Sequence, residues 1–247
     1  MPMLISVITV CYNSEKTIRD TIESVLNQTY GQVEYLVIDG RSTDRTVAIA
    51  REYAPRFAAK GYRYTIVSEP DRGIYDAMNK GIRMAAGEIV GIINSDDWYE
   101  PDALETVSRT YAEEPFDIFY ADIRLIKYNG KTLIKHSRLE KHPSSRNWNH
   151  PTTFITRQTY QECGLFACKG FYDDYDLVLR IRRAGKKVVI RNKVIANFRC
   201  GGVSNTKSLK ACWKRILDRY RVYRDNGFGR IYFLECAATE VAKLLLS

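Results

Sequence analysis

Short apolar runs alternate with amphipathic stretches through residues 4–93. The runs are rich in Val, Ile and Leu and have the length of buried strands, and they span Leu4–Val10, Val33–Asp39, Tyr64–Ser68 and Glu88–Ile93. Between them, apolar residues recur at helical spacing, as in Ile18, Ile22, Val25 and Leu26. Strands that alternate with helices predict right-handed crossovers and a doubly wound, mostly parallel sheet of the Rossmann-like α/β class.

The pattern changes after residue 110. Asn129-Gly130 is a strong hairpin signal between two alternating segments. Further strands are predicted at Phe116–Lys127, Lys131–His136, Thr152–Thr156, Val188–Ile190 and Val194–Phe198. We therefore expect residues 1–110 and 111–205 to form two halves of one domain, followed by a helical tail over residues 206–247.

Polar side chains follow each of the four strands in the first half. They are Tyr12, Asp39, Asp71 and Asp96. In open α/β sheets, ligands bind beyond the carboxyl ends of the strands. Two adjacent carboxylates, Asp96-Asp97, are costly to keep ionised after a buried strand unless a cation joins them. They predict a site for a divalent ion and the phosphates that it carries. The alternative is an Asx turn that caps a helix predicted at Pro101–Tyr111.

A second acidic cluster stands at the start of a helix that we expect to end at Gly185. Its members are Asp173, Asp174 and Asp176. Capping and dipole complementarity account for one or two of them. Three carboxylates within four residues repel one another, which raises the proton affinity of at least one and suits it to act as a base.

Composition adds limits on class and location. The 247 residues suffice for one large α/β domain without staples. No apolar run approaches the roughly 20 residues of a membrane-spanning helix, and no leader is visible. The six cysteines lack close metal-ligand spacing, so we expect reduced thiols and a cytoplasmic protein.

The net charge of +9 raises the question of an anionic partner. From Lys207 onward, the chain has nine basic and four acidic residues, and aromatic residues are interleaved with them. Such a tail can lie on an anionic membrane, which would make the protein peripheral on the inner face of the cytoplasmic membrane. Packing of the tail on the domain by its apolar stripe is an equal alternative. Nucleic acid is disfavoured, because acidic clusters stand at the strand ends.

Several of these segments together resemble family 2 glycosyltransferases over residues 4–204. They are Val7-Ile8-Thr9-Val10-Cys11-Tyr12-Asn13, Asp39-Gly40-Arg41-Ser42-Thr43-Asp44, Asp71-Arg72-Gly73-Ile74-Tyr75-Asp76-Ala77-Met78-Asn79-Lys80-Gly81, Ser95-Asp96-Asp97 and Asp173-Asp174-Tyr175-Asp176-Leu177. The resemblance implies a GT-A fold with a mixed sheet, a nucleotide-diphosphate sugar donor (UDP-sugar favoured), Mg²⁺ or Mn²⁺, and inversion at the anomeric carbon. Residues 1–110 would bind the nucleotide sugar and residues 111–205 the acceptor, a glycan or lipid-linked molecule of the cell envelope.

The resemblance also implies individual roles. The nucleotide would be bound by Val10, Tyr12, Asp39, Asp71, Asn79 and Asp96. Asp97, with Asp96, would hold the metal. Asp174 matches the base that deprotonates the acceptor hydroxyl, with Asp173 as the alternative, and Trp148 and His150 would lie near the acceptor. Processive members carry a Gln-x-x-Arg-Trp motif where this chain has Leu179-Arg180-Ile181-Arg182-Arg183, so we expect one hexose to be added per acceptor.

Two other functions remain open on the residues alone. A sugar nucleotidyltransferase also joins such a sheet to a metal and a nucleotide. It ordinarily has a glycine-rich loop with a basic residue after the first strand, and Cys11-Tyr12-Asn13-Ser14-Glu15 supplies neither. A non-enzymatic, basic polyanion-binding protein would instead bind its partners in a salt-sensitive way without turning over a donor.

Overall fold

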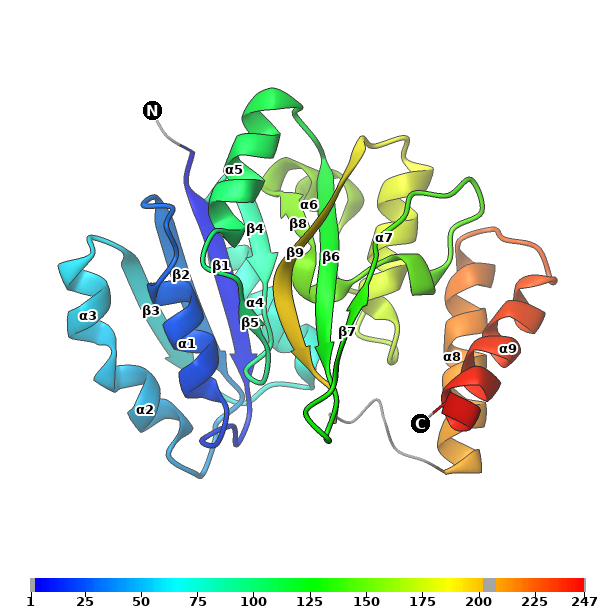
Figure 1. Cartoon of the computed structure of the whole chain (residues 1–247), viewed down its shortest axis with the longest axis horizontal. Helices are drawn as coiled ribbons and strands as arrows, with labels where there is room; N and C mark the ends of the chain where they lie inside the picture. The colour runs from blue at the N-terminus through cyan, green and yellow to red at the C-terminus, as the bar shows by residue number, and fades with distance from the viewer. Residues whose placement is uncertain (1–2, 202–207, 247) are drawn as a thin grey trace.

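Nine strands form one mixed sheet in the computed structural model, which describes residues 3–201 and 208–246 (Figure 1). The strands are β1 (Ile5–Cys11), β2 (Val33–Asp39), β3 (Arg63–Ser68), β4 (Ile89–Ile92), β5 (Trp98–Tyr99), β6 (Ile118–Ile126), β7 (Thr132–Lys135), β8 (Phe154–Thr156) and β9 (Val188–Arg199). Their order across the sheet is β3-β2-β1-β4-β8-β6-β9-β5, with β7 paired to β6. The strands β1 to β4 are parallel, whereas β8 runs antiparallel between β4 and β6.

Helices cover both faces of the sheet (Figure 1). One face carries α1 (Ile18–Leu26), α2 (Thr46–Glu52), α3 (Ala54–Ala59) and α5 (Ala103–Glu113). The other carries α4 (Ile74–Met84), α6 (Arg157–Cys163) and α7 (Asp173–Arg183), with α8 (Leu209–Asp225) and α9 (Tyr232–Leu246) beyond α7. Two short 3₁₀ turns, η1 (Ser145–Asn147) and η2 (His150–Thr152), precede β8. Each face has its own apolar layer, as a doubly wound fold requires.

The two predicted halves share this sheet, because β8 lies directly beside β4 and β6 lies on the other side of β8. The contact is close at Gly91, where a Cβ would lie 2.3 Å from Cε1 of Phe154. A glycine in the middle of a buried strand is therefore explained by the ring that packs against it. The first-half strands lie where the apolar runs predicted them.

Several element bounds differ from the sequence-based prediction, and three of the differences are informative. The two strands expected at Val188–Ile190 and Val194–Phe198 form one strand, β9, whose register against β6 shifts beside Ala121 and Asp122. That irregularity accommodates the polar residues between the two apolar runs. The helix predicted from Pro101 begins at Ala103. We expect Thr43 and Asp44 to open the second helix from the sequence, whereas α2 begins at Thr46, whose amide donates to the Asp44 carboxylate.

The C-terminal helices α8 and α9 form an antiparallel hairpin that packs on the domain (Figure 1). Several aromatic residues of the tail lie in the second apolar layer, where Tyr223 is fully buried and contacts the rings of Tyr175 and Tyr232. These packed aromatics are therefore wholly or partly withdrawn from a membrane, whereas Trp213 is 55 % exposed, so membrane contact of the tail stays a prediction. The predicted boundary between residues 205 and 206 lies outside the described residues.

A buried ionic cluster joins the two helices of the hairpin. The carboxylate of Glu240 accepts hydrogen bonds from Arg215 at 2.7 Å and from Arg219 at 2.8 Å. The side chains of Glu240 and Arg219 are 0 % and 2 % exposed. Two of the nine basic residues in the tail are thus internal to the fold. None of the helices in the described part of the chain has both the length and the apolar character needed to cross a bilayer.

We expect the substitution Glu240→Gln to destabilise the protein strongly. It would remove the negative charge that the Arg215 and Arg219 guanidinium groups share, and breaking a buried ion pair in this way costs about 3–5 kcal/mol. The free energy of unfolding, measured by urea denaturation, should fall by that amount. The matched control is Asp225→Asn on the exposed end of α8, which should change it by less than about 0.5 kcal/mol. Equal denaturation midpoints for both variants would contradict a stabilising role for the cluster.

Candidate active site

The carboxyl ends of β1 to β4 meet at one edge of the sheet, because these strands are parallel. Asp39 ends β2 there, buried, and its carboxylate accepts hydrogen bonds from the Ser42 amide at 3.0 Å and the Ser68 hydroxyl at 2.6 Å. A Cβ on the next residue, Gly40, would lie 2.5 Å from Oδ2 of Asp71. Asp39 and Asp71 are therefore neighbours at this edge, and the glycine permits their loops to approach.

Val10 and Tyr12 differ sharply in exposure at the end of β1. Val10 is buried in the core, whereas the Tyr12 side chain is 64 % exposed. The Tyr12 ring lies beside Gly40 and so faces the same edge as Asp39. An exposed aromatic ring at such an edge can stack on a flat ligand.

The pair Asp96-Asp97 follows β4, and neighbouring protein groups compensate its negative charge poorly. Asp97 is 0 % exposed, and its Oδ1 accepts the Arg199 amide at 3.0 Å. Its Oδ2 is buried without a hydrogen-bond partner. Burial, added to by the charge of Asp96, raises the pKa of Asp97 well above the usual aspartate range. Burial also raises the pKa of Asp96.

An oxygen left unpartnered beside a second carboxylate fits a divalent cation. Mg²⁺ and similar ions take oxygen ligands and are commonly held by one or two carboxylates together with substrate phosphates. Within residues 3–201 and 208–246, no group of three or more His, Cys, Asp or Glu side chains is gathered to hold a metal. The donor set at Asp96 and Asp97 therefore fits an ion that phosphate oxygens help to bind.

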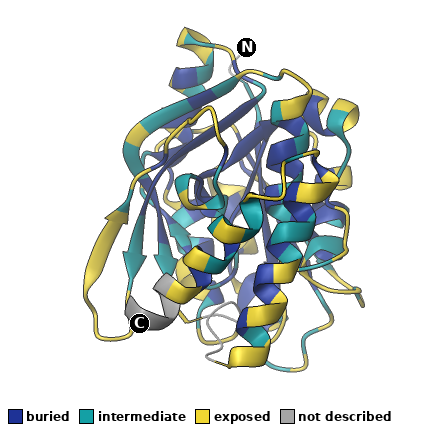
Figure 2. Cartoon of the chain, turned by 90° about the vertical axis from the view of Figure 1, so that its right-hand side faces the viewer, coloured by how far each residue is buried: buried dark blue, intermediate teal, exposed yellow. Residues whose placement is uncertain are grey.

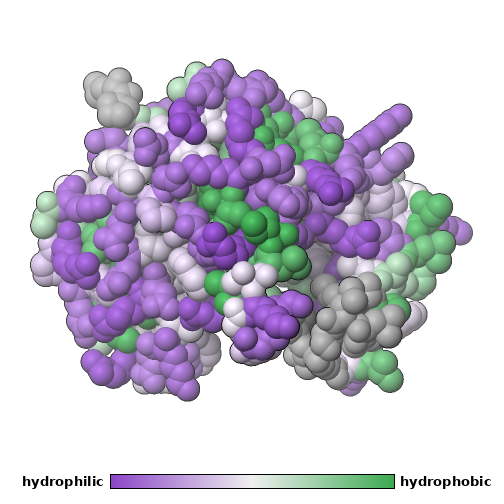
Figure 3. Space-filling model, in the orientation of Figure 1, coloured by the Kyte–Doolittle hydropathy of each residue, from purple (hydrophilic) through white to green (hydrophobic). Residues whose placement is uncertain are grey.

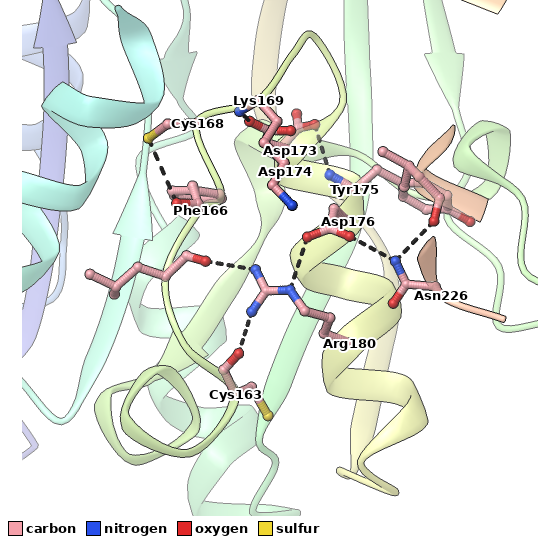
Figure 4. A network of polar contacts seen from close by, with 12 residues as sticks. Cys163, Phe166, Cys168, Lys169, Asp173, Asp174, Tyr175, Asp176, Arg180 and Asn226 are labelled. Atoms are coloured by element: carbon pink, nitrogen blue, oxygen red, sulfur yellow. Dashed lines mark hydrogen bonds and ion pairs between the residues drawn. The ribbon is translucent and has the colours of Figure 1, made fainter. Parts of the chain in front are cut away.

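Asp173 is engaged in holding a loop (Figure 4). Its carboxylate is 1 % exposed and accepts the backbone amides of Lys169 and Gly170, the latter at 3.0 Å. Arg221 of α8 lies 3.7 Å from its other oxygen. These contacts bend the chain into the start of α7 and leave Asp173 little capacity for another ligand.

Asp174 has a different environment. Its Oδ2 lies 3.7 Å from Nδ1 of His150, and its Oδ1 accepts the Tyr175 amide at 2.8 Å. Burial raises the pKa of Asp174, which His150, the Tyr175 amide and the Tyr75 hydroxyl partly offset. Among the first-turn acids of α7, it has the environment of a proton acceptor.

Asp174 and His150 line a small, mostly apolar cavity. Ile92, at the end of β4, also lines it, so the cavity adjoins the strand that carries Asp96 and Asp97. Trp148 forms another wall, with its ring 5.9 Å from the His150 ring, and its Nε1 is buried without a partner. Nε2 of His150 is likewise unpartnered. The fold thus brings both predicted acceptor residues to Asp174.

Asn79, a predicted nucleotide-binding residue, has side-chain contacts with the loop before α7. Its side chain is buried on α4, where the amide donates to the Phe166 carbonyl at 2.9 Å and accepts the Phe166 amide at 3.0 Å. Both ends of the side chain are used in this clamp. Asn79 therefore braces the loop that leads to α7 rather than facing the nucleotide edge with Asp39 and Asp71, because its polar atoms are already paired.

Two residues at the site carry no role in the sequence analysis. The hydroxyl of Tyr75 donates to the Phe171 carbonyl at 2.8 Å and lowers the pKa of Asp174. Its position inside the segment Asp71–Gly81, which helped to carry the resemblance, was the available signal. Arg199 contributes a backbone amide to Asp97, which no side-chain pattern could reveal.

Comparison with known sequences identifies relatives over most of the chain. The profile described as Glycosyl transferase family 2 matches residues 6–172. A PGL/p-HBAD biosynthesis glycosyltransferase of Mycobacterium bovis is 32% identical over 225 residues, covering 86% of this chain and 84% of its own. A chondroitin synthase of Escherichia coli is 30% identical over 189 residues, which are 74% of this chain and 27% of that protein.

Solved structures share the fold at low identity. TarS of S. aureus in complex with UDP-GlcNAc is 18% identical, with a TM-score of 0.67 over 98% of this chain and 72% of the other. The mannosyltransferase PcManGT from Pyrobaculum calidifontis, in complex with GDP-Man and Mn²⁺, has the same TM-score and is 18% identical, over 100% of this chain and 76% of its own. These likenesses place the sheet and its helices in the GT-A fold.

We expect His150 to titrate below the ordinary histidine pKa. Burial lowers its pKa, while the charge of Asp174 raises it. The substitution Asp174→Asn removes that charge and should lower the pKa of His150 further. NMR of the imidazole Cε1–H signals against pH measures both values, and a His150→Gln variant identifies the signal. A rise in the pKa of His150 on Asp174→Asn would show that the two groups do not interact as described.

Proposed function

The chain belongs to glycosyl transferase family 2, and on that premise we propose that it moves a hexose from a nucleotide-diphosphate donor, with a UDP-sugar favoured, to a hydroxyl group of a glycan or lipid-linked acceptor. One observation carries the proposal. Within one fold, an under-compensated carboxylate pair follows β4, and Ile92 at the end of β4 lines a cavity that also contains a separate, half-buried carboxylate with a raised pKa, Asp174. Family membership favours this reaction over nucleotidyl transfer and over polyanion binding.

The nucleotide is assigned to the edge formed by the first four strands. Asp39 and Asp71 lie together there, and the exposed Tyr12 ring stands beside them. Structural neighbours hold UDP-GlcNAc or GDP-Man at 18% identity, which supports a nucleotide sugar without choosing the base. A thermal-shift screen of UDP- and GDP-sugars would identify the donor, because a ligand stabilises the fold it binds by mass action.

Asp96 and Asp97 are assigned to a divalent cation and the ribose. The neighbour in complex with Mn²⁺ supports a metal, as does the unpartnered oxygen of Asp97. When bound there, Mg²⁺ or Mn²⁺ would neutralise negative charge that develops on the leaving diphosphate. The backbone amide of Arg199 holds Oδ1 of Asp97, so only Oδ2 remains for that role.

Asp174 is assigned as the base. A hydroxyl is a weak nucleophile, and a carboxylate within reach of its proton assists attack on the anomeric carbon. Asp173 is the weaker candidate, since its oxygens already accept two backbone amides and approach Arg221. Attack opposite the departing diphosphate is a single displacement, which inverts the configuration and gives a β-linked product from an α-linked donor.

The acceptor is assigned to the cavity walls around Asp174. The unpartnered ring nitrogens of Trp148 and His150 offer hydrogen-bonding groups to its hydroxyls, since buried polar atoms favour a ligand that satisfies them. Burial lowers the pKa of His150 and keeps its ring mostly neutral. The neutral ring can donate or accept a hydrogen bond without competing with Asp174 for a proton.

The variant Asp174→Asn should bind donor and lose transfer. Loss of a general base lowers kcat by about 10²–10⁴-fold. In the parent enzyme, kcat/KM should fall with decreasing pH at a value above the ordinary aspartate pKa of 3.8, because protonation through the raised pKa removes the base. Calorimetry with UDP and Mn²⁺ checks binding, and release of UDP checks turnover. An inactive but stably folded Asp173→Asn beside an active Asp174→Asn would reverse the assignment.

The variant Asp97→Ala should remain folded and lose the metal-dependent part of diphosphate binding. In the parent protein, UDP affinity measured by calorimetry should increase when Mn²⁺ is added, because Asp97 would help to hold the cation and the positive charge would favour the phosphates. The control is Asp44→Ala, which removes a half-buried carboxylate that accepts the Thr46 amide at the start of α2. If Mn²⁺ enhances UDP binding to Asp97→Ala as much as to the parent protein, then Asp97 does not hold the cation.

A further inference from the structure

The α8–α9 hairpin exposes large apolar side chains. Figure 2 looks onto this side of the molecule, where many hairpin residues are coloured as exposed. Among the described side chains, six of the fourteen exposed large apolar residues lie on this hairpin. We call them the apolar ridge, and they are Leu209, Trp213, Leu217, Ile231, Leu234 and Val241. Apolar residues gather at the same edge of the molecule in Figure 3. A concentration of this kind marks an interaction surface, whereas single exposed apolar residues do not.

The ridge follows helical geometry on both helices. On α8, Leu209, Trp213 and Leu217 are four residues apart and so form one stripe. On α9, Leu234 and Val241 are two turns apart and share a face, 66 % and 50 % exposed. The rings of Trp213 and Phe233 contact each other with centroids 6.2 Å apart, which joins the two stripes.

Charge is absent from the outward side of α9 through residue 241. Both acidic residues of that segment turn inward, since Glu235 accepts the Ser144 hydroxyl at 2.7 Å and Glu240 is buried against Arg219. A packed helix of a monomer normally presents charged residues to water on its outer face. Through residue 241, this helix turns its acidic side chains inward and exposes apolar ones, so water is a poor partner for that part of its outer face.

Basic residues border the ridge on α8. Lys210 and Lys214 lie one position beyond Leu209 and Trp213, so they form the adjacent stripe, and both are exposed. The net charge of the chain is +9. A second copy of the chain would bring like charges together across such a contact. An anionic lipid surface instead offers an apolar acyl region for the ridge and the opposite charge for the lysines. Charge complementarity therefore selects the lipid surface.

The surface continues to the loop that precedes the proposed base. Nζ of Lys214 lies 5.3 Å from the centre of the Phe171 ring, which is 42 % exposed. Phe171 is two residues before Asp173, and its carbonyl accepts the Tyr75 hydroxyl. An apolar and basic surface thus extends from the hairpin to the rim of the acceptor cavity.

We propose that the apolar ridge, with Lys210, Lys214 and Phe171, docks the protein on an anionic lipid bilayer. The ridge side chains enter the interface, the lysines pair with lipid head groups, and the acceptor cavity is held beside the membrane. The contact uses side chains other than the buried aromatics of the tail. It does not depend on the transfer reaction, because lipid binding needs neither donor nor acceptor.

The test is sedimentation of the full chain with vesicles of phosphatidylcholine alone and of phosphatidylcholine mixed with phosphatidylglycerol. We expect binding to the anionic vesicles that weakens with salt. The variant Trp213→Ser/Ile231→Ser/Leu234→Ser should lower the partition coefficient about 100-fold, because three apolar side chains lose interfacial burial. The variant Lys210→Gln/Lys214→Gln should lower it about 30-fold on anionic vesicles.

The matched control carries the same kind of change on the β7 side. Tyr128→Ser/Leu133→Ser/Ile134→Ser removes three exposed apolar side chains and should bind vesicles like the parent. Circular dichroism and thermal melting confirm that each variant is folded. Equal loss in both triple variants, equal binding to neutral and anionic vesicles, or no binding would overturn the proposal. A concentration-dependent dimer that only the ridge variant abolishes, without lipid binding, would assign the ridge to a second copy.

Discussion

The carboxylate of Asp173 joins three parts of the structure on which the site depends: the loop before α7, the start of α7, and α8. It accepts the amides of Lys169 and Gly170 in the loop before α7, and it faces Arg221 on α8. A buried carboxylate that accepts backbone amides is a strong local constraint, because such charge-assisted bonds are stronger than neutral ones. It fixes where α7 begins, and hence where Asp174 stands relative to His150 and the cavity. The acid beside the proposed base thus acts as its support.

The site contains carboxylate groups whose hydrogen-bonding capacity or negative charge is not fully compensated by the protein. Asp97 keeps an unpartnered oxygen, and burial raises the pKa of both Asp97 and Asp174. Groups of this kind are unfavourable for folding and are retained where a ligand or a reaction uses them. The parallel strands explain their placement, since equal strand direction brings every strand end to one edge.

Much of the fold could be predicted from the sequence, for identifiable reasons. The strands β1, β2 and β4 are buried on both faces, so each appears as a continuous apolar run that few other structures share. β9 was predicted as two strands because polar residues interrupt its apolar pattern where its register against β6 shifts. The clamp between Asn79 and Phe166 joins residues 87 apart, and periodicity carries no information on such pairs. In the tail, both sides of α8 carry apolar residues, so the pattern could not tell the buried side from the exposed one.

Arg219 contacts two groups that lie in different parts of the molecule. One of its nitrogens donates both to Glu240 on α9 and to the hydroxyl of Tyr172, the residue before Asp173. Its guanidinium also lies over the Tyr172 ring, 4.6 Å from the centre. The hairpin and the loop before the proposed base are therefore coupled through a buried, short-range contact. A displacement of the hairpin would be transmitted through Arg219 to the turn that precedes Asp174.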